Sequence, residues 1–257
     1  AWLRCCWKKL PPHKQITYRL RGTFIAIHAQ TLIMKNALLL LLTLPLLAYQ
    51  CNKDVVYTEP VNFQPVKAGS SWTYDTKNNI SSATGSFTLT ATSKDSSFNG
   101  RTYRVVSSTA GANVYFAKSG SDYYQLANFE ALNQQLELLY LKDGLSVGTS
   151  WDQNISVNIP AIGSTTVKLT NTVVANLNSY TLNGKTFEKV IHIKTVMGNI
   201  TIPGLPLAIT PVTDINSYYA AGIGRIYNRS KVNIVIPTQP TINTDDETSL
   251  RTYTIVP

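Results

Sequence analysis

The chain of 257 residues carries 23 Lys and Arg against 14 Asp and Glu, a formal charge of +9, and 44% of its residues are hydrophobic. Seven of the basic residues and none of the acidic ones lie in residues 1–50, which leaves 16 against 14 in residues 51–257. That part is close to neutral, so nucleic-acid binding loses its electrostatic basis. Beyond Cys51 there is no cysteine for a disulfide, a zinc cluster or a nucleophile.

Residues 1–33 begin with Ala1 and show neither an acidic residue nor a lasting hydrophobic period. We expect them to be a non-native upstream extension, with Met34 as the true initiator. The alternative is an unusually long basic region in front of a signal peptide.

Residues 34–50 place Lys35 before an apolar run at 37–48. A run of about 12 apolar residues is shorter than the roughly 20 that cross a bilayer as a helix. The pattern is typical of a helical signal peptide, and Cys51 follows directly. The alternatives are a secreted protein with a free thiol and an uncleaved signal anchor.

These residues resemble the start of lipoproteins from Bacteroidota-type bacteria, although Tyr49 and Gln50 depart from the usual cleavage box. The resemblance implies cleavage before Cys51, lipidation of its thiol and anchoring in the outer membrane, on the periplasmic or the surface face. Lys53 and Asp54 imply export to the surface, which is the face we favour. The membrane, reached through this anchor, is then the first expected partner.

Residues 51–69 contain two prolines and predict a tether, and residues 70–257 predict one β-domain. Alternation of apolar and polar residues, with many Thr, Tyr and Val, indicates half-buried antiparallel strands. The expected strands are 72–76, 86–92, 101–108, 113–117, 123–126, 136–141, 151–159, 165–177, 186–196, 215–220, 224–227, 232–236 and 250–256. The one helix candidate in the mature part is 128–135.

Motifs of the first half recur in the second. The pairs are 69–72 (GSSW) with 148–151 (GTSW), 99–103 (NGRTY) with 183–187 (NGKTF), and 115–117 (YFA) with 218–220 (YYA). A Pro- and Gly-rich insert at 197–212 accounts for the drift in spacing. We therefore expect two related meanders, at about 63–127 and 141–230, in one strongly curved sheet or half-open β-barrel, because a period of roughly 80 is too long for a solenoid.

Three stretches carry a further resemblance: 65–74 (PVKAGSSWTY), 139–151 (LYLKDGLSVGTSW) and 218–224 (YYAAGIG). They resemble the TapB-like lipoproteins, a family without a known biochemical function. That family is in turn similar to half-open barrels of the LolA type, in which a curved antiparallel sheet wraps an apolar concavity. The resemblance covers most of residues 63–227 and implies architecture and location, not activity.

Candidate chemistry is sparse. His192 is the only histidine after residue 50 and has no second histidine or cysteine to share a metal, so we expect no metal and no cofactor. Asp75, Asp152 and Glu188 are the acids inside strand patterns, and even the internal repeat does not pair them as a hydrolase would need. We expect a protein that is not an enzyme.

Aromatic residues are the remaining candidates for ligand contact. Trp72 and Trp151 recur at matching places, which favours a core role. Tyr124 and Tyr219 each follow another tyrosine in a strand, so one of each pair faces away from the core. They are our candidates for ligand contact. The expected function is non-enzymatic binding of an apolar or glycan ligand or a partner protein; the alternatives are a carboxylate-dependent hydrolase and a structural or adhesive surface module.

Overall fold

The computed structural model describes residues 61–129, 134–159, 163–201, 208–235 and 241–257. All of them belong to one compact unit, Tyr57–Pro257. The expected signal peptide at 34–50 and the residues Cys51, Lys53 and Asp54 lie outside the described residues, so their roles stay predictions.

The described chain folds into strands that follow one another in a single antiparallel sheet. The strands are β1 (Ser71–Asn78), β2 (Thr84–Phe98), β3 (Arg101–Ser108), β4 (Gly111–Ser119), β5 (Asp122–Phe129), β6 (Gln134–Lys142), β7 (Ser150–Ile159), β8 (Gly163–Leu182), β9 (Lys185–Met197), β10 (Val212–Ala220), β11 (Gly224–Ile234) and β12 (Ile242–Thr254).

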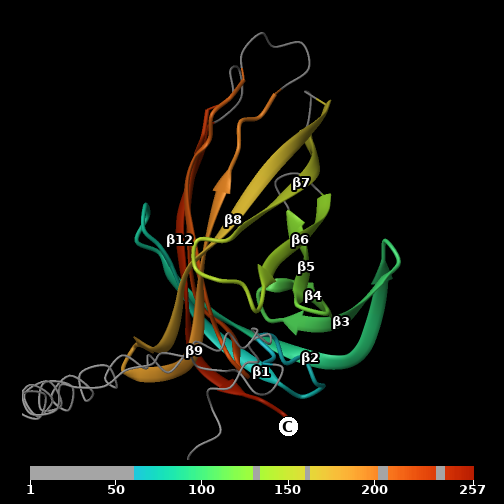
Figure 1. Cartoon of the computed structure of the whole chain (residues 1–257), viewed down its shortest axis with the longest axis vertical. Helices are drawn as coiled ribbons and strands as arrows, with labels where there is room; N and C mark the ends of the chain where they lie inside the picture. The colour runs from blue at the N-terminus through green and yellow to red at the C-terminus, as the bar shows by residue number, and fades with distance from the viewer. Residues whose placement is uncertain (1–60, 130–133, 160–162, 202–207, 236–240) are drawn as a thin grey trace, which may run out of the picture. The chain divides into compact units, whose positions relative to one another are not determined.

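The sheet has the order β6-β5-β4-β3-β2-β1-β12-β11-β10-β9-β8-β7. It curls into a nearly closed barrel whose edge strands, β6 and β7, face each other across one seam without a backbone ladder (Figure 1). The expected β fold and half-open barrel are confirmed. The helix candidate at 128–135 is wrong: Asn128 pairs with Gln135 across β5 and β6, because ladder partners override the local propensity of this short run.

The strands divide into two meanders with the same number of strands, β1–β6 and β7–β12, which join where β1 pairs with β12. The recurring sequence motifs fall on strands of the same rank: the GSSW and GTSW motifs lead into β1 and β7, and the two Asn-Gly motifs lead into β3 and β9. The YFA and YYA motifs lie in β4 and β10.

The Asn-Gly motifs make the same turn in both halves. Asn99 and Gly100 have φ angles of 48° and 76°, and Asn183 and Gly184 have 50° and 75°. Two successive residues with positive φ are what a two-residue hairpin turn of type I′ requires, and Asn followed by Gly tolerates this conformation best. Each half therefore folds its second and third strands into a hairpin by local sequence alone.

The first glycine of each half also plays the same part. Gly69 donates its backbone N–H to Ala91 O and Gly148 donates to Val173 O, both at 2.8 Å. These bonds extend the pairing of the first strand with the second in both meanders.

Residues 61–69, which the sequence places in the tether, pack against the barrel. Phe63 is buried and its N–H donates to the Tyr123 hydroxyl at 3.1 Å, while Asn62 O accepts from the N–H of Gly222 in the β10–β11 turn. This segment joins strands of both halves at one end of the barrel. The packed domain therefore begins earlier than residue 70, because Phe63 finds an apolar site among distant residues.

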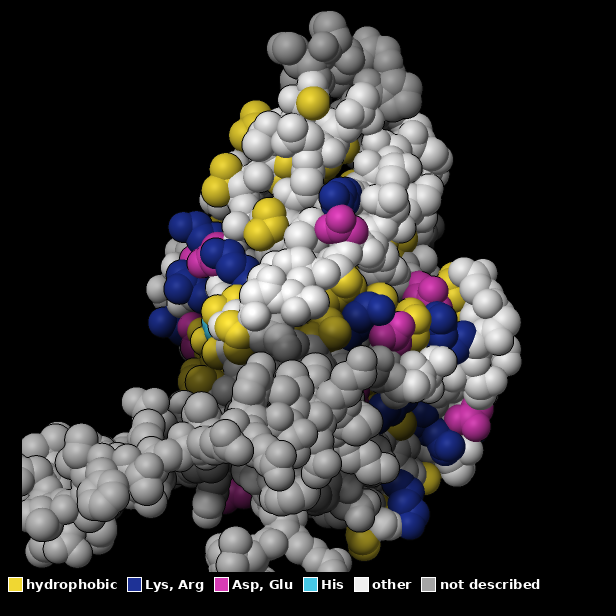
Figure 2. Space-filling model, in the orientation of Figure 1, with side chains coloured by type: hydrophobic (Ala, Val, Ile, Leu, Met, Phe, Trp, Pro, Cys, Tyr) yellow, Lys and Arg dark blue, Asp and Glu magenta, His cyan; other side chains and the backbone are white. Residues whose placement is uncertain are grey.

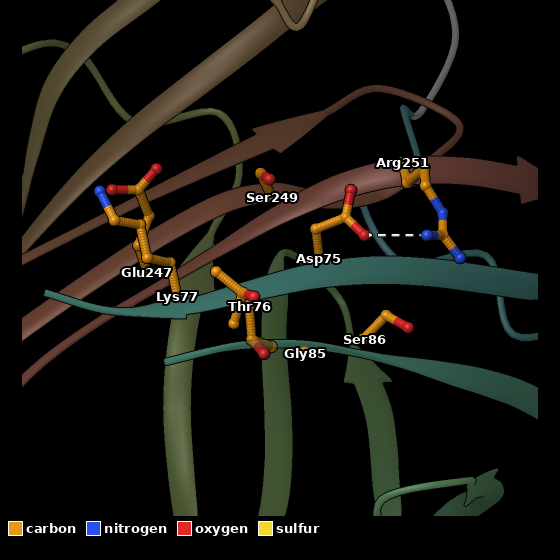
Figure 3. A pocket seen from close by; sticks show the side chains of 9 residues that line it. Asp75, Thr76, Lys77, Gly85, Ser86, Glu247, Ser249 and Arg251 are labelled. Carbon is orange, nitrogen blue, oxygen red and sulfur yellow. Dashed lines mark ion pairs between the residues drawn. The ribbon is translucent and has the colours of Figure 1, made fainter. Parts of the chain in front are cut away.

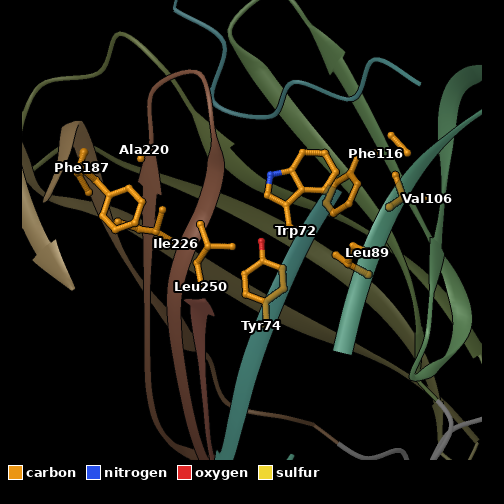
Figure 4. Packing of buried hydrophobic residues seen from close by; sticks show 11 residues of the cluster. Trp72, Tyr74, Leu89, Val106, Phe116, Phe187, Ala220, Ile226 and Leu250 are labelled. Atoms are coloured by element: carbon orange, nitrogen blue, oxygen red, sulfur yellow. The ribbon is translucent and has the colours of Figure 1, made fainter. Parts of the chain in front are cut away.

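That end of the barrel is filled by a hydrophobic core. Trp72, Tyr74, Leu89 and Phe116 point toward one another from β1, β2 and β4 (Figure 4). Trp72 has 1% of its surface exposed, and Trp151 in the second half has 8%, so the core role expected for both is confirmed. Burying side chains of this size stabilises the fold by about 1.5 to 3 kcal/mol each.

Candidate functional site: a cavity inside the barrel

The other part of the barrel interior holds a cavity of about 510 Å³. Its wall is built from β5 through β12, so strands of both meanders contribute. This volume lies within the roughly 300–1,000 Å³ that is usual for small-molecule sites.

Most of the wall is aliphatic. The apolar residues that line the cavity are Leu136, Leu138, Leu139, Ile155, Val157, Val167, Leu169, Met197, Ile200, Ile215, Val232, Ile234 and Ile242. Strand alternation brings them inside: Val167 and Leu169 in β8, for example, are separated by the exposed Lys168. Ile200 belongs to the described part of the 197–212 insert and is paired with Ile209, so this insert adds apolar wall to the cavity.

A smaller group of polar residues also lines the cavity. Asn171 accepts a hydrogen bond from Thr195 Oγ1 at 2.6 Å, and Asn228 accepts one from Ser217 Oγ at 2.8 Å. Each amide oxygen therefore has one partner within the protein. The side-chain NH₂ group of each asparagine can also donate hydrogen bonds to a ligand.

Arg225 joins this wall because of a β-bulge. Tyr218 pairs with Tyr227 and Tyr219 pairs with Arg225, so Ile226 has no partner of its own in β10. In a regular strand Arg225 and Tyr227 would share a face. The extra residue shifts the alternation by one, as bulges do where a side chain is re-aimed, and Arg225 lines the cavity beside Tyr219.

Three tyrosines surround the Arg225 end of the cavity. Burial raises the pKa of Tyr219, raises that of Tyr140 well above its usual value, and raises that of Tyr74 to about 12. Their hydroxyls stay protonated at neutral pH, and those of Tyr74 and Tyr140 already donate to Arg225 O at 2.8 Å and to Gln64 Oε1 at 3.4 Å. The tyrosines near the guanidinium of Arg225 are therefore uncharged at neutral pH.

Side chains, not backbone, close the seam beside the cavity. Gln153 of β7 accepts a bond from the N–H of Leu139 and donates one to Glu137 O, both at 2.8 Å. The Trp151 indole N–H donates to Leu139 O at 3.1 Å. The amide of Gln153 thus takes the place that a neighbouring strand would occupy on β6.

The backbone of β7, the other edge strand, is bonded to a glutamine in the same way. Gln134 of β6 donates to Ser156 O at 3.1 Å and accepts from the N–H of Asn158 at 2.9 Å. Two glutamines, one on each edge, therefore satisfy backbone groups that an open edge would leave unpaired.

The two tyrosines expected to contact a ligand lie in different places. Tyr219 is 3% exposed and lines the cavity. Tyr124 lies under Arg101, whose guanidinium carbon is 3.4 Å from the ring centroid, and its hydroxyl donates to Asp122. It is absent from the described cavity wall and packs in a separate cluster with Tyr103. The structure does not bring the two together.

A second hollow of about 490 Å³ lies over β1, β2 and β12 (Figure 3). It is polar, and its Asp75 and Arg251 form an ion pair at 3.1 Å. Figure 2 shows the same mixture of signs on the visible face, where basic and acidic side chains lie next to one another. The charges of Asp75 and Arg251 in this groove therefore already have partners within the protein.

Carboxylates are placed away from the cavity. Asp152 pairs with Lys168 at 2.8 Å, and no Asp or Glu is found among the described residues of the cavity wall. The described ranges also contain no group of three His, Cys, Asp or Glu side chains able to hold a metal. A hydrolase would need two convergent carboxylates, and the described wall does not supply them.

His192 lies on the face of β9 opposite the buried Ile191 and Ile193, as alternation predicts. Its ring stacks on Tyr218 at 4.1 Å, and its Nε2 is 2.9 Å from Asn216 Oδ1. These contacts pack the imidazole against neighbouring side chains on this face of the sheet.

Sequence reasoning missed Arg225, Gln153 and Gln134. Arg225 follows the Gly-Ile-Gly turn that the sequence does single out, and a strained turn beside an arginine is the one signal that could have drawn attention to it. The glutamines carry no such signal, because their role depends on strands that are not hydrogen-bonded neighbours.

No known protein family and no curated protein matches the chain by sequence. Two solved structures resemble it: a predicted exported protein with a YmcC-like fold from Bacteroides fragilis, at 12% identity and a TM-score of 0.45, and a predicted lipoprotein from Parabacteroides distasonis, at 9% and 0.46. Each comparison covers 76% of this chain and 100% of the other. Likenesses at this level decide nothing about ligand or location, and membership in the TapB-like family stays a prediction.

Within the described ranges there is no helix with the length and apolar character needed to span a bilayer.

Proposed function

We propose that this chain is a non-enzymatic binding protein of the cell envelope that holds an apolar chain molecule inside its barrel. The observation that carries the proposal is the cavity of about 510 Å³ with a mainly aliphatic wall. Aliphatic side chains recognise shape and hydrophobic surface and provide no group for chemistry.

The energetics favour a long ligand over a small one. Each methylene removed from water contributes about 0.8 kcal/mol, so ten methylenes contribute about 8 kcal/mol. Association itself costs roughly 4 kcal/mol or more in lost freedom. A short apolar molecule would therefore bind weakly, whereas an alkyl chain of about ten carbons or more exceeds this cost.

The location is part of the proposal and is supported by the sequence of residues 34–54. The short apolar run and Cys51 favour a lipid anchor, and anchoring by two or more acyl chains is stable. The outer membrane is the proposed site, with Lys53 and Asp54 favouring its outer surface. A protein held at a membrane surface would meet apolar chain molecules directly.

Filling the cavity tests the proposal. Val232 lines the cavity from β11, and Val232→Trp places an indole where the ligand would lie. We expect the affinity for a fluorescent naphthylamine probe to fall about tenfold or more, since losing contact with two methylenes already costs about 1.6 kcal/mol. The readout is probe fluorescence during titration with the full chain.

The matched control is Val174→Trp, which adds the same side chain at a position that is 40% exposed on β8. Its probe affinity is expected to equal that of the parent chain. Equal loss in both variants, or no probe binding by the parent chain, would refute the cavity as the binding site.

A further inference from the structure

The geometry points to an anionic head group as the second half of the ligand: we infer that the cavity binds a single-chain amphiphile whose carboxylate or phosphate reaches Arg225. The inference rests on the proposed function and names the chemical class of its ligand.

Arg225 is unusual among the described arginines. The others each form an ion pair with a carboxylate, namely Arg101 with Glu137, Arg104 with Asp95, Arg229 with Asp245 and Arg251 with Asp75. Across the part of the chain that the structure describes, no ion pair involves Arg225. Placing a charge in a partly desolvated position without a counter-charge costs free energy. A ligand that brings the counter-charge would recover that cost.

The position of Arg225 matches one end of an elongated ligand. Together with Gln125, Tyr140 and Tyr219 it lines both the main cavity and a small void of about 10 Å³ that extends into the aromatic core. The cavity lining continues along β11 past two polar residues, Asn228 and Ser230, to Val232 and Ile234. Nine residues of strand span roughly 30 Å at about 3.3 Å each, so a chain can lie along the wall with its head at Arg225.

The backbone around Arg225 is held in place before any ligand arrives. The Tyr74 hydroxyl donates to Arg225 O at 2.8 Å, and the Trp72 indole N–H donates to Ile223 O at 2.6 Å. Gly224 between them has a φ of +114°, and a Cβ there would lie 3.3 Å from Gln64 Oε1. Two buried aromatics and one glycine therefore fix the backbone of the bulge that aims Arg225 inward, so little backbone ordering entropy remains to be lost on binding.

The chemistry of the surrounding groups suits an anion. A guanidinium binds two oxygens of a carboxylate or phosphate in a fork geometry that lysine cannot reproduce. The side-chain NH₂ groups of Asn171 and Asn228, which line the same cavity, are donors as well. Among the described wall residues no carboxylate competes for Arg225.

The test compares three ligands that share one chain: dodecanoate, dodecyl phosphate and dodecanol. Each displaces the naphthylamine probe from the full chain carrying Cys51→Ala, which keeps protein-linked acyl groups out of the measurement. We expect dodecanoate, dodecyl phosphate or both to bind about tenfold or more tightly than dodecanol, because hydrogen bonds to charged groups exceed neutral ones. Whichever anion binds more tightly identifies the source of the head group.

The variant Arg225→Gln should remove this preference, so that it binds the two anions about as tightly as it binds dodecanol. Arg225→Lys should retain part of it, since the charge remains and the fork is lost. Arg251→Gln, in the outer groove, is the control and should keep the full preference. Each variant's dodecanol affinity shows that the cavity is still formed.

The outcomes separate the two proposals. Equal binding of the anions and dodecanol by the parent chain, or an anion preference that survives Arg225→Gln, overturns this inference and leaves apolar binding in place. Absence of binding by all three ligands overturns the proposed function and this inference with it.

Discussion

At the scale of single residues, the buried tyrosines show how the barrel interior depends on protonation. Tyr74 donates its hydroxyl to Arg225 O, and burial raises its pKa to about 12. Burial, followed by hydrogen bonding to Glu137, also raises the pKa of Tyr103 to about 12. Both side chains must lose a proton in the folded state at a higher pH than in the unfolded chain.

This difference predicts alkaline instability. Above pH 10 the unfolded chain releases tyrosine protons that the folded chain keeps, so the free energy of unfolding falls as the pH rises from about 10 to about 12. For Tyr74 alone a rise from 10.0 to about 12 corresponds to about 3 kcal/mol. Urea unfolding across this pH range, with tyrosinate absorbance recorded in parallel, measures the effect.

The same titration in concentrated urea is the control, because every tyrosine should then ionise near its ordinary pKa. A free energy of unfolding that stays constant up to pH 12, with all tyrosines ionising together near pH 10 in the folded chain, would contradict the burial of these hydroxyls.

The inward orientation of Arg225 could not be predicted from the sequence of its own strand. In a regular strand Arg225 would face the side opposite Ile226, which is buried, and would therefore point outward. The bulge in β11 turns it inward instead. A bulge is created by the register between two strands, so it is not visible in either strand's sequence taken alone.

At the scale of elements, the seam between β6 and β7 is the least conventional part of the barrel. Gln153 bonds to Leu139 N and Glu137 O and so supplies two hydrogen bonds across it. The hydrogen bonds described across this line come from side chains, and no ladder joins the two backbones. The seam also borders the cavity, since Gln153 and Leu139 both line it.

We predict that Gln153→Leu lowers the free energy of unfolding by about 1 to 3 kcal/mol, because two hydrogen bonds of about 0.5 to 1.5 kcal/mol each are lost and two backbone groups lose their partners. Urea unfolding measures the loss, and faster amide exchange at Leu139 locates it. The neighbouring Asn154→Leu, on an exposed position of β7, should stay within about 0.5 kcal/mol of the parent chain. Equal stability of both variants would show that Gln153 does not hold the seam.

Strand prediction failed where the interior is polar. The sequence pattern indicates two short strands at 224–227 and 232–236, whereas β11 extends unbroken from Gly224 to Ile234. Asn228 and Ser230 face the cavity, so the apolar half of the alternation is missing between the two runs. The break in the pattern therefore comes from the polar part of the cavity lining.

At the scale of the whole molecule, both meanders contribute to each part of the barrel interior. Trp72 and Phe116 of the first share the aromatic core with Phe187 of the second. Leu136 of the first and Val167 of the second share the aliphatic cluster along the cavity. The contents of the interior therefore depend on packing between strands that are far apart in sequence.

The predicted lipid anchor at Cys51 concerns the location of the whole molecule. Cys51→Ala should move the protein from the membrane fraction to the soluble fraction, because the acyl chains that would hold it have no thiol to attach to. Fractionation with immunodetection, together with metabolic labelling by a fatty acid, measures the change. Serine substitutions elsewhere in the region, such as Asn52→Ser, serve as the control and should leave the membrane fraction unchanged. An unlabelled parent chain whose distribution is unaffected by Cys51→Ala would contradict the anchor.

The sequence by itself determined the β class, the hairpins at the two Asn-Gly turns, the related halves and the core positions of Trp72 and Trp151. These features depend on local backbone preference and on alternation, which a single strand carries in full. Only the tertiary structure decided that the interior is partly hollow, that Gln153 and Gln134 bridge the seam and that Arg225 faces inward. Those depend on register between distant strands, where a shift of one residue exchanges the inner and outer faces.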